Sequence, residues 1–310
     1  MEQLLKDVDR IKCLEIQGAT NVAISAIDFL SCYAQRITCQ NLNDCFEQLY
    51  NAVDILIEAR PTEPTMKNGL KYIMNKLEQE KESIIPEYIA DFIEKYKNLY
   101  HDMLQTSKIR IAEIGARRFP EVGQNFVVMT HCHSSLVTGI LLEAKKQGKN
   151  FKIINTETQP RLQGRKTSKE LLKAGIEVIH VVDSAMRWAV KHYQVNIILI
   201  GADSITSEGT IINKIGSRLL ALVAHEEHVP FYVASPLLKY NPETNLGILE
   251  TIEMRDPKEI WENPPKGIKI LNPAFETVSR RYIDGLITEA GIFASSHVPN
   301  YFAKTYPDMV

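Results

Sequence analysis

The stretch that decides the fold is Asn125-Phe126-Val127-Val128-Met129-Thr130-His131-Cys132-His133-Ser134-Ser135. Its apolar first half predicts a buried strand, and its polar second half begins where that strand ends. About seventy residues later the same arrangement recurs, with Asn196-Ile197-Ile198-Leu199-Ile200 leading into Gly201-Ala202-Asp203-Ser204-Ile205. Ligands of open α/β sheets sit beyond the carboxyl ends of the strands. The two stretches therefore predict a site at that edge, to which one brings a thiol and the other a carboxylate.

Cys132 and Asp203 each have a structural interpretation beside the chemical one. A lone Cys after a strand is most often a small core residue. An Asp that closes a strand most often caps the helix that follows. Because the two stand at equivalent strand ends, we favour chemistry: Cys132 as a base or nucleophile, and Asp203 as a group that holds or passes a proton.

The sequence around these stretches alternates between strand and helix patterns. Further strands are predicted over residues 151–156, 177–182 and 230–234, and helices over residues 167–174, 184–191 and 218–225. Such alternation predicts a parallel sheet with right-handed crossovers. The sequence has no GxGxxG and no GxxxxGK[ST], so neither a dinucleotide fingerprint nor a P-loop is present.

The first part of the chain has the spacing of helices. Apolar residues recur every three or four positions from Leu4 to Leu14. Residues 60–65 contain two prolines and are expected to be extended. A helix is predicted over residues 68–81, and a long one over residues 85–118 with an interruption or bend near Thr106-Ser107. The expected fold is α/β: a helical N-terminal domain over residues 1–120, then a Rossmann-like domain over residues 121–310 with a mainly parallel sheet.

Composition excludes several classes of protein. The 310 residues are 45% hydrophobic and 24% charged, with a net charge of −2, which are the values of an ordinary globular protein. Without a basic stripe we expect no nucleic-acid partner, and without a long apolar run we expect no membrane partner. Five cysteines at irregular spacing predict reduced thiols and a cytoplasmic location. We expect neither a metal nor another cofactor, because Cys132 would point away from its two flanking histidines.

Several polar segments suit phosphate. Residues 161–168 place Arg161 and a Gly-containing loop before a helix, which favours an anion, although a solvated basic loop is equally consistent. Asn213 and Lys214 lie between glycines in an apolar segment, where an unpaired charge would be costly. Lys239 follows another strand. The remaining candidates are Ser134 and Ser135 beside Cys132, Arg60 before Pro61, and the Gly18-Ala19 break in a helical pattern.

These motifs together resemble the ribose-1,5-bisphosphate isomerases. They form the archaeal branch of a superfamily shared with methylthioribose-1-phosphate isomerases and the regulatory α, β and δ subunits of initiation factor 2B. The resemblance covers nearly the whole chain. It is carried by Ile16-Gln17-Gly18-Ala19, Glu58-Ala59-Arg60-Pro61-Thr62, His131-Cys132-His133-Ser134, Thr156-Glu157-Thr158-Gln159-Pro160-Arg161 with Gln163-Gly164, Val182-Asp183-Ser184-Ala185, Gly201-Ala202-Asp203-Ser204-Ile205-Thr206, Ile212-Asn213-Lys214-Ile215-Gly216, Glu253-Met254-Arg255-Asp256-Pro257 and Asn272-Pro273-Ala274-Phe275.

The resemblance implies isomerisation of α-D-ribose 1,5-bisphosphate to D-ribulose 1,5-bisphosphate, in nucleoside monophosphate salvage that feeds a Rubisco. It makes Cys132 the proton acceptor and Asp203 the proton donor. The implied substrate-binding residues are Gln17, Gly18, Ala19, Arg60, Ser134, Ser135, Arg161, Asn213, Lys214 and Lys239. It also implies a nucleotide effector such as AMP, and homodimers built through the C-terminal domains and assembled into hexamers.

Two positions depart from the isomerase pattern. Gln17 stands where the isomerases usually carry Arg, and Gln159 likewise replaces an Arg. Gln donates hydrogen bonds but has no charge. A second hypothesis therefore stays open, in which the chain is a regulatory protein of the initiation factor 2B type whose pocket senses a nucleotide or sugar phosphate. Retention of Cys132 and Asp203 favours the enzyme.

Overall fold

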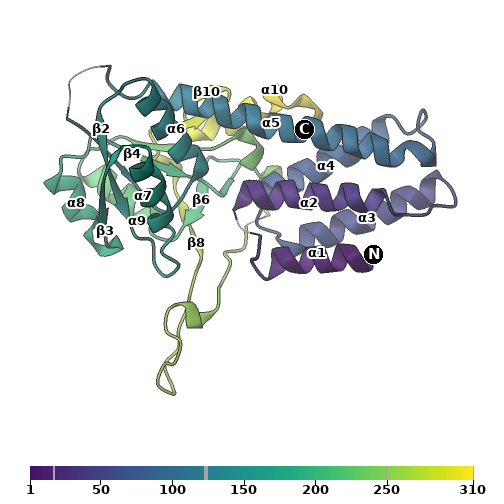
Figure 1. Ribbon diagram of the computed structural model, residues 1–310, viewed down its shortest axis with the longest axis horizontal. Coiled ribbons are helices and arrows are strands. Elements are labelled where there is room, and N and C mark those ends of the chain that lie inside the picture. The colour runs from purple at the N-terminus through teal and green to yellow at the C-terminus, as the bar shows by residue number, and fades with distance from the viewer. Residues whose placement is uncertain (17, 122–124, 249, 310) are drawn as a thin grey trace. The chain divides into compact units, whose positions relative to one another are not determined.

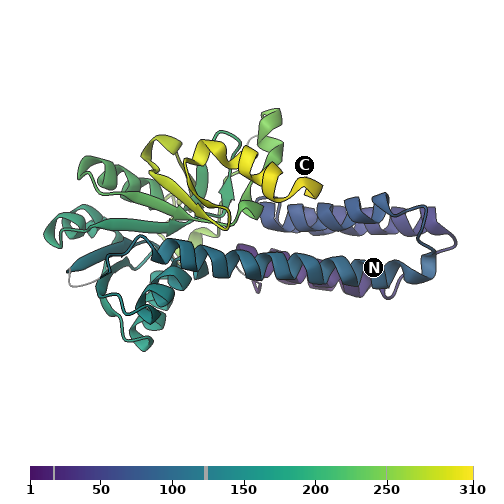
Figure 2. The same cartoon turned by 90° about the horizontal axis from the view of Figure 1, so that it is seen from above.

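The computed structural model describes residues 1–16, 18–121, 125–248 and 250–309. They divide into two compact units (Figures 1 and 2). The helical unit comprises Met1–Thr106 and Phe302–Val310, and the sheet unit comprises Ser107–Tyr301. None of the helices within the described ranges has the length and apolar character needed to cross a membrane.

Among its described residues, the helical unit contains four helices in sequence, the first part of a fifth and the end of α10 (Val298–Thr305). The first five are α1 (Glu2–Lys12), α2 (Ala19–Ala34), α3 (Leu42–Ala59), α4 (Pro64–Gln79) and α5 (Ile89–Ala116), the last preceded by the 3₁₀ turn η1 (Pro86–Tyr88). The apolar spacing that predicted these helices buries one face of each, as with Leu4, Val8 and Ile11 of α1. Helix α4 begins at Pro64, four residues before the predicted start, because proline suits the first helical position.

Helix α5 corrects one expectation. An interruption or bend was predicted near Thr106-Ser107, and the helix has no interruption over its 28 residues. Propensity is a weak prior that packing routinely overrides, and Ser107 is buried here. The boundary between the two compact units falls between the same two residues.

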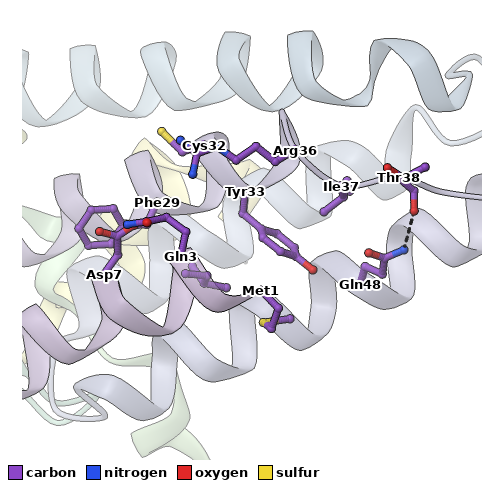
Figure 3. A pocket seen from close by; sticks show the side chains of 11 residues that line it. Met1, Gln3, Asp7, Phe29, Cys32, Tyr33, Arg36, Ile37, Thr38 and Gln48 are labelled. Atoms are coloured by element: carbon purple, nitrogen blue, oxygen red, sulfur yellow. Dashed lines mark hydrogen bonds between the residues drawn. The ribbon is translucent and has the colours of Figure 1, made fainter.

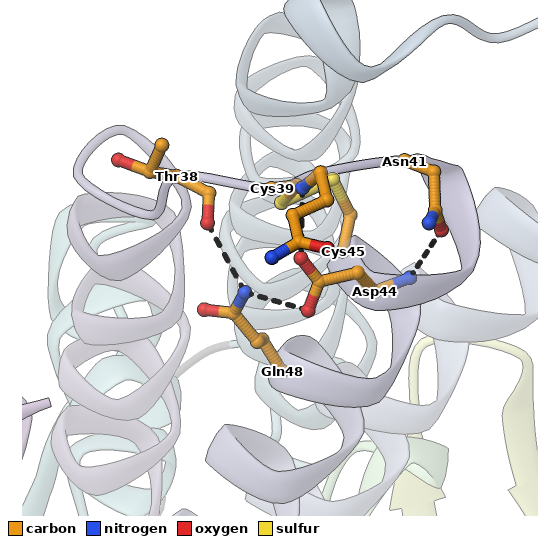
Figure 4. Close-up of a disulfide and its surroundings, with 7 residues drawn as sticks. Thr38, Cys39, Asn41, Asp44, Cys45 and Gln48 are labelled. Carbon is orange, nitrogen blue, oxygen red and sulfur yellow. Dashed lines mark hydrogen bonds between the residues drawn. A yellow bond between two sulfur atoms is a disulfide. The ribbon is translucent and has the colours of Figure 1, made fainter.

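The expectation of five reduced cysteines is wrong for one pair. Cys39 and Cys45 form a disulfide across the turn that leads into α3, with Cα atoms 5.2 Å apart (Figure 4). In that turn, the Asn41 side chain accepts a hydrogen bond from the Asp44 backbone and caps the helix. The capped turn brings the two cysteines within bridging distance, which irregular spacing in the sequence did not reveal. Cys13, Cys32 and Cys132 are free thiols.

The sheet unit confirms the predicted α/β class and its mainly parallel, Rossmann-like sheet. Seven strands lie in the order β10-β9-β7-β4-β1-β2-β3, and all neighbours are parallel except β10 and β9. Their bounds are β1 (Phe126–Thr130), β2 (Phe151–Thr156), β3 (Glu177–Val181), β4 (Ile197–Gly201), β7 (Phe231–Ala234), β9 (Gly285–Thr288) and β10 (Gly291–Phe293). The chain order reverses between β1 and β4, the position at which doubly wound sheets bind ligands.

Five helices belong wholly or partly to this unit besides the end of α5. They are α6 (Ser135–Lys146), α7 (Gly164–Lys173), α8 (Met186–His192), α9 (Ser217–Glu226) and the start of α10 (Val298–Thr305). Leu136 and Ile140 of α6, Leu171 of α7 and Ile111 of α5 form one apolar core with the strands. The packing of these helices against the strands holds the strand ends in place.

A second, antiparallel sheet was not predicted. It consists of β5 (Ser204–Ile205), β6 (Ile211–Lys214) and β8 (Phe275–Val278) in the order β5-β6-β8. Its strands are short, and their partners lie far apart in the chain, so no local pattern marks the sheet. Strand β6 places Lys214 directly opposite Phe275 of β8.

Candidate functional site

Cys132 lies in the turn between β1 and α6, in a backbone conformation that non-glycine residues rarely adopt. Its φ angle is 68°, in the left-handed region. The Cys132 amide donates to Thr158 Oγ1 over 2.9 Å, and its carbonyl accepts from Thr167 Oγ1 over 2.9 Å. Strained residues persist only where their surroundings hold them, and they gather at functional sites. The turn therefore presents the thiol from a fixed position.

The thiol of Cys132 is protonated in the resting protein. Burial raises its pKa to about 11, while the nearby Lys214 ammonium acts in the opposite direction and Asp203 adds to the rise. The Sγ–H group faces Gln163 Oε1 at 3.6 Å, an acceptor that suits a thiol and not a thiolate. The ammonium of Lys214 favours the thiolate form of Cys132, but burial outweighs that charge.

His131 is a neutral structural residue. Its Nε2 lies 2.8 Å from the carbonyl of Ile215, so Nε2 carries the hydrogen and Nδ1 accepts from Thr156 Oγ1 at 2.6 Å. Burial lowers its pKa, with the Asp183 carboxylate acting in the opposite direction. Both ring nitrogens are thus engaged, and the imidazole connects β2 to the residue that follows Lys214.

Lys214 is a buried cation at the end of β6. Its residue is 6% exposed, and its Nζ lies 4.7 Å from the centroid of the Phe275 ring. Burial lowers its pKa, while Cys132 and Asp203 both act to raise it. The neighbouring Asn213 donates to Ser217 Oγ over 2.8 Å, which ties β6 to the start of α9.

Asp203 lies between β4 and β5, and its amide donates to the Ile212 carbonyl over 2.8 Å. It is only half-buried. Its charge acts on both Cys132 and Lys214, so these three ionisable groups are electrostatic neighbours. Lys239, in the 3₁₀ turn η3 (Leu237–Lys239) after β7, is buried, and its Nζ donates to the carbonyl of Ala202.

Ser134 and Ser135 begin helix α6. The Ser134 hydroxyl accepts from the amide of Val137 and acts as the N-cap. It also lies against β4, since a Cβ atom at Gly201 would come within 2.7 Å of Ser134 Oγ. The absence of a side chain at Gly201 therefore lets the Cys132 turn approach the Asp203 turn. Ser135 is exposed.

A small cleft adjoins this group of residues. It has a volume of about 10 Å³, which is room for about one water molecule. Its lining consists of Gln159, Pro160, Arg161, Gln163, Lys214, Ile215, Arg255, Glu259, Asn272, Pro273 and Ala274. Arg161 and Glu259 approach to 3.4 Å across it. A phosphorylated sugar can enter only if the cleft widens.

The structure brings Cys132, Asp203, Arg161 and Lys214 to one region. It adds residues that had no role predicted from the sequence. Gln163, Thr158, Thr167 and Arg255 contact or border this region. Three of these four belong to the motifs quoted above, so the signal was present in the sequence, but only the folded backbone shows what each side chain contacts.

Four of the predicted site residues fall in the sequence range of the helical unit: Gln17, Gly18, Ala19 and Arg60. Gln17 lies outside the described residues. Gly18 is the N-cap of α2, with a φ angle of 86°, and Ala19 is the first residue of that helix. The Arg60 guanidinium is buried and lies 3.7 Å from Glu63 Oε1. That these residues share the cleft with Lys214 stays a prediction.

A larger cavity lies within the helical unit. Its volume is about 220 Å³, and its lining comes mainly from α1, α2 and the segment that follows α2 (Figure 3). Gln48 closes one side by donating to the carbonyl of Thr38 over 3.2 Å. None of the predicted site residues belongs to its described lining.

Comparison with known proteins finds relatives that match this chain over almost its whole length. A ribose 1,5-bisphosphate isomerase of Thermococcus kodakarensis is 38% identical over 310 residues, covering 98% of this chain and 93% of that protein. The crystal structure of translation initiation factor eIF-2B from Pyrococcus horikoshii OT3 has a TM-score of 0.79 at 26% identity, covering 95% of this chain and 98% of that one.

A second solved structure, the 5-methylthioribose 1-phosphate isomerase of Pyrococcus horikoshii OT3, has a TM-score of 0.78 at 25% identity, covering 97% of this chain and 88% of that one. Residues 15–295 match the Initiation factor 2 subunit family. The chain therefore belongs to the Initiation factor 2 subunit family.

Proposed function

We propose that this protein is a sugar-phosphate isomerase that converts α-D-ribose 1,5-bisphosphate to D-ribulose 1,5-bisphosphate, in nucleoside monophosphate salvage. The observation that carries the proposal is the buried ammonium of Lys214 next to Cys132 and Asp203. A buried cation beside a thiol and a carboxylate suits a negatively charged substrate that must gain and lose protons. The related isomerases support this choice of substrate.

In the proposed reaction, Asp203 donates a proton to the ring oxygen as the bond from that oxygen to C1 breaks. Cys132 takes the C2 hydrogen as a proton, and the C2–H electron pair forms a double bond between C2 and the electron-poor C1. The thiol then returns the proton to C1. The proton of the C2 hydroxyl goes to Asp203 as the ketone forms, so both residues finish as they began. A direct hydride shift from C2 to C1 gives the same product and is the alternative route.

Both residues must change protonation state before this reaction begins. Cys132 is a thiol at rest, so in the proposed reaction its proton first passes to the Asp203 carboxylate, which leaves a thiolate base and a carboxylic acid. Asp203 is half-buried, and a bound sugar would shield its carboxyl group from water. We propose that the chain works in the cytoplasm, because the exposed cysteines Cys13 and Cys32 are free thiols beside the disulfide.

The alternative function is that of a regulatory sensor of the initiation factor 2B type. The likeness to the Pyrococcus horikoshii eIF-2B structure favours it. A sensor binds its sugar phosphate or nucleotide and releases it unchanged. The two functions are therefore separated by turnover and not by binding.

The test uses the purified full chain with ribose 1,5-bisphosphate, methylthioribose 1-phosphate and AMP. Phosphorus NMR follows conversion, and calorimetry follows binding. An isomerase converts the bisphosphate to ribulose 1,5-bisphosphate, and leaves methylthioribose 1-phosphate unchanged. Binding without conversion of any compound would establish the sensor, and conversion of methylthioribose 1-phosphate alone would change the proposed substrate.

We also propose that the protein forms a homodimer or homohexamer through its sheet unit. The segment between β7 and β8 that contains η5 (Pro257–Glu259) extends from the sheets (Figure 1). It exposes Trp261, Ile268 and Leu271. Contiguous exposed apolar surface is typical of interaction sites, and these three side chains come from one segment. Light scattering on the full chain at several concentrations tests the proposal, and a monomer at all of them contradicts it.

A further inference from the structure

Arg255 is a buried cation with an unused donor. Its side chain is 8% exposed, and its Nε donates to Glu253 Oε1 over 3.1 Å. Its Nη1 atom is also buried, and it has no hydrogen-bond partner among the residues that the structure describes. A buried donor without a partner costs free energy, and such a group in a site needs an explanation.

Arg255 lines the cleft, and backbone hydrogen bonds hold it there. Its amide donates to the carbonyl of Asn272 over 2.9 Å, and the amide of Ala274 donates to the carbonyl of Glu253 over 2.9 Å. These two bonds form a short antiparallel ladder at the base of the extended segment. The amide of Ile215 donates to Ala274 over 3.1 Å, so the ladder continues to the residue after Lys214.

Arg255 and Lys214 share one aromatic ring as well as the cleft. The Lys214 Nζ lies 4.7 Å and the Arg255 Cζ 5.9 Å from the centroid of Phe275. The two positive charges are close enough that Arg255 lowers the pKa of Lys214. Two like charges in a desolvated cleft repel one another, and a bound anion relieves that repulsion.

We propose that Arg255 and Lys214 form an anion subsite that takes one phosphate group of the sugar phosphate. The ammonium serves as a point charge, and the free Nη1 of the guanidinium donates a charge-assisted hydrogen bond to a phosphate oxygen. The identity of the sugar rests on the proposed function, whereas the preference for phosphate rests on the cleft itself. Gln159 also lines the cleft but carries no charge. Arg255 therefore adds a third cation to the lining, beside Arg161 and Lys214.

Four variants of the full chain test the subsite. Arg255→Gln removes the charge, and Arg255→Lys retains it. Glu253→Gln removes the carboxylate that pairs with Arg255 but leaves the arginine in place. Lys258→Gln removes an exposed cation of the same segment. Circular dichroism checks the fold of each, and calorimetry with inorganic phosphate measures the affinity.

We expect Arg255→Gln to weaken phosphate binding roughly tenfold or more, the loss expected for one charge-assisted hydrogen bond. Arg255→Lys should recover part of that loss, and Lys258→Gln should stay within about twofold of the wild type. Glu253→Gln removes a negative charge that acts on Lys214, so phosphate binding should be unchanged or tighter. The KM for ribose 1,5-bisphosphate should follow the same order.

Three results overturn the subsite: no phosphate binding by the wild type, unchanged binding in Arg255→Gln, or an equal loss in Arg255→Gln and Glu253→Gln. The last would show that Arg255 serves only its ion pair. The proposed function fails separately. A protein that turns over no bisphosphate but shows the expected phosphate pattern keeps the subsite, and an active enzyme with unchanged binding in Arg255→Gln loses it.

Discussion

The hydroxyl of Thr167 donates to the carbonyl of Cys132 over 2.9 Å, from the first turn of α7 to the turn after β1. Nδ1 of His133 lies 3.0 Å from the same hydroxyl. Because the hydroxyl hydrogen is already given to Cys132, the imidazole donates to the oxygen. One side chain thus holds both the Cys132 carbonyl and the His133 ring. Thr167 is therefore a positioning residue for the left-handed turn.

Removal of the Thr167 hydroxyl should loosen this turn. In Thr167→Val a buried carbonyl loses its donor, so we expect the free energy of unfolding to fall by about 1–3 kcal/mol and turnover to fall with it. Thr167→Ser keeps the hydroxyl and serves as the control. Urea denaturation and turnover measure the two effects, and Val and Ser variants that match in both would remove Thr167 from this role.

The backbone of Cys132 should carry a measurable strain. Cys132→Gly and Cys132→Ala both remove the thiol, but only Ala keeps a Cβ atom in the left-handed region. The left-handed conformation costs a non-glycine residue about 1–2 kcal/mol, and part of that is offset by the greater freedom of Gly when unfolded.

We therefore expect Cys132→Gly to be about 1 kcal/mol more stable than Cys132→Ala in urea, with both variants inactive. An Ala variant that equals or exceeds the Gly variant would show that the turn is not strained at this position.

The protonation state of Cys132 can be tested by its alkylation. Burial raises the pKa of the thiol to about 11, so the reactive thiolate fraction should grow about tenfold per pH unit throughout the range from 7 to 10. Mass spectrometry of the Cys132 peptide after timed iodoacetamide treatment gives the rate.

Lys214→Met removes the charge that lowers this pKa, and should slow the alkylation of Cys132 at each pH. The exposed Cys13 reports on the reagent within the same sample. A Cys132 rate that levels off near pH 8.5–9, the range of an ordinary thiol, would contradict the account of burial.

The ion pair between Arg161 and Glu259 should compete with substrate. The two groups lie 3.4 Å apart in the cleft, and a phosphate must displace or repel the carboxylate. Glu259→Gln should therefore lower the KM for the bisphosphate, by roughly threefold to tenfold if one charge-assisted bond becomes available. Glu262→Gln, at an exposed position of the same segment, is the control. Equal KM values in both variants would leave Glu259 without influence on binding.

The main features of the fold could be predicted from sequence because they are local. The apolar runs before Thr130 and before Gly201 each form a strand of the large sheet within one residue of the predicted ends. The small sheet could not be predicted, since Lys214 and Phe275 are paired across about sixty residues. The disulfide between Cys39 and Cys45 likewise depends on the geometry of one turn.

The strand-end positions of the candidate site residues could be predicted from the sequence, and the electrostatics around them could not. Cys132 and Asp203 each follow an apolar run that forms a strand. The two strands, β1 and β4, are neighbours in the sheet. The raised pKa of Cys132 depends on how deeply the turn is buried, which no pattern of residues states. Arg255 was visible as part of a motif, but its role depends on a ladder between segments about twenty residues apart.

The most direct test of the account measures turnover in two matched variants. Cys132→Ser and Asp203→Asn change one functional group each and keep the size of the side chain. Wild type and both variants are given ribose 1,5-bisphosphate, with conversion followed by phosphorus NMR and binding by calorimetry. The account predicts that the wild type forms ribulose 1,5-bisphosphate, while both variants bind the substrate and form no product. Near-normal conversion by either variant would contradict the assignment of that residue, and no conversion by the wild type would contradict the enzyme.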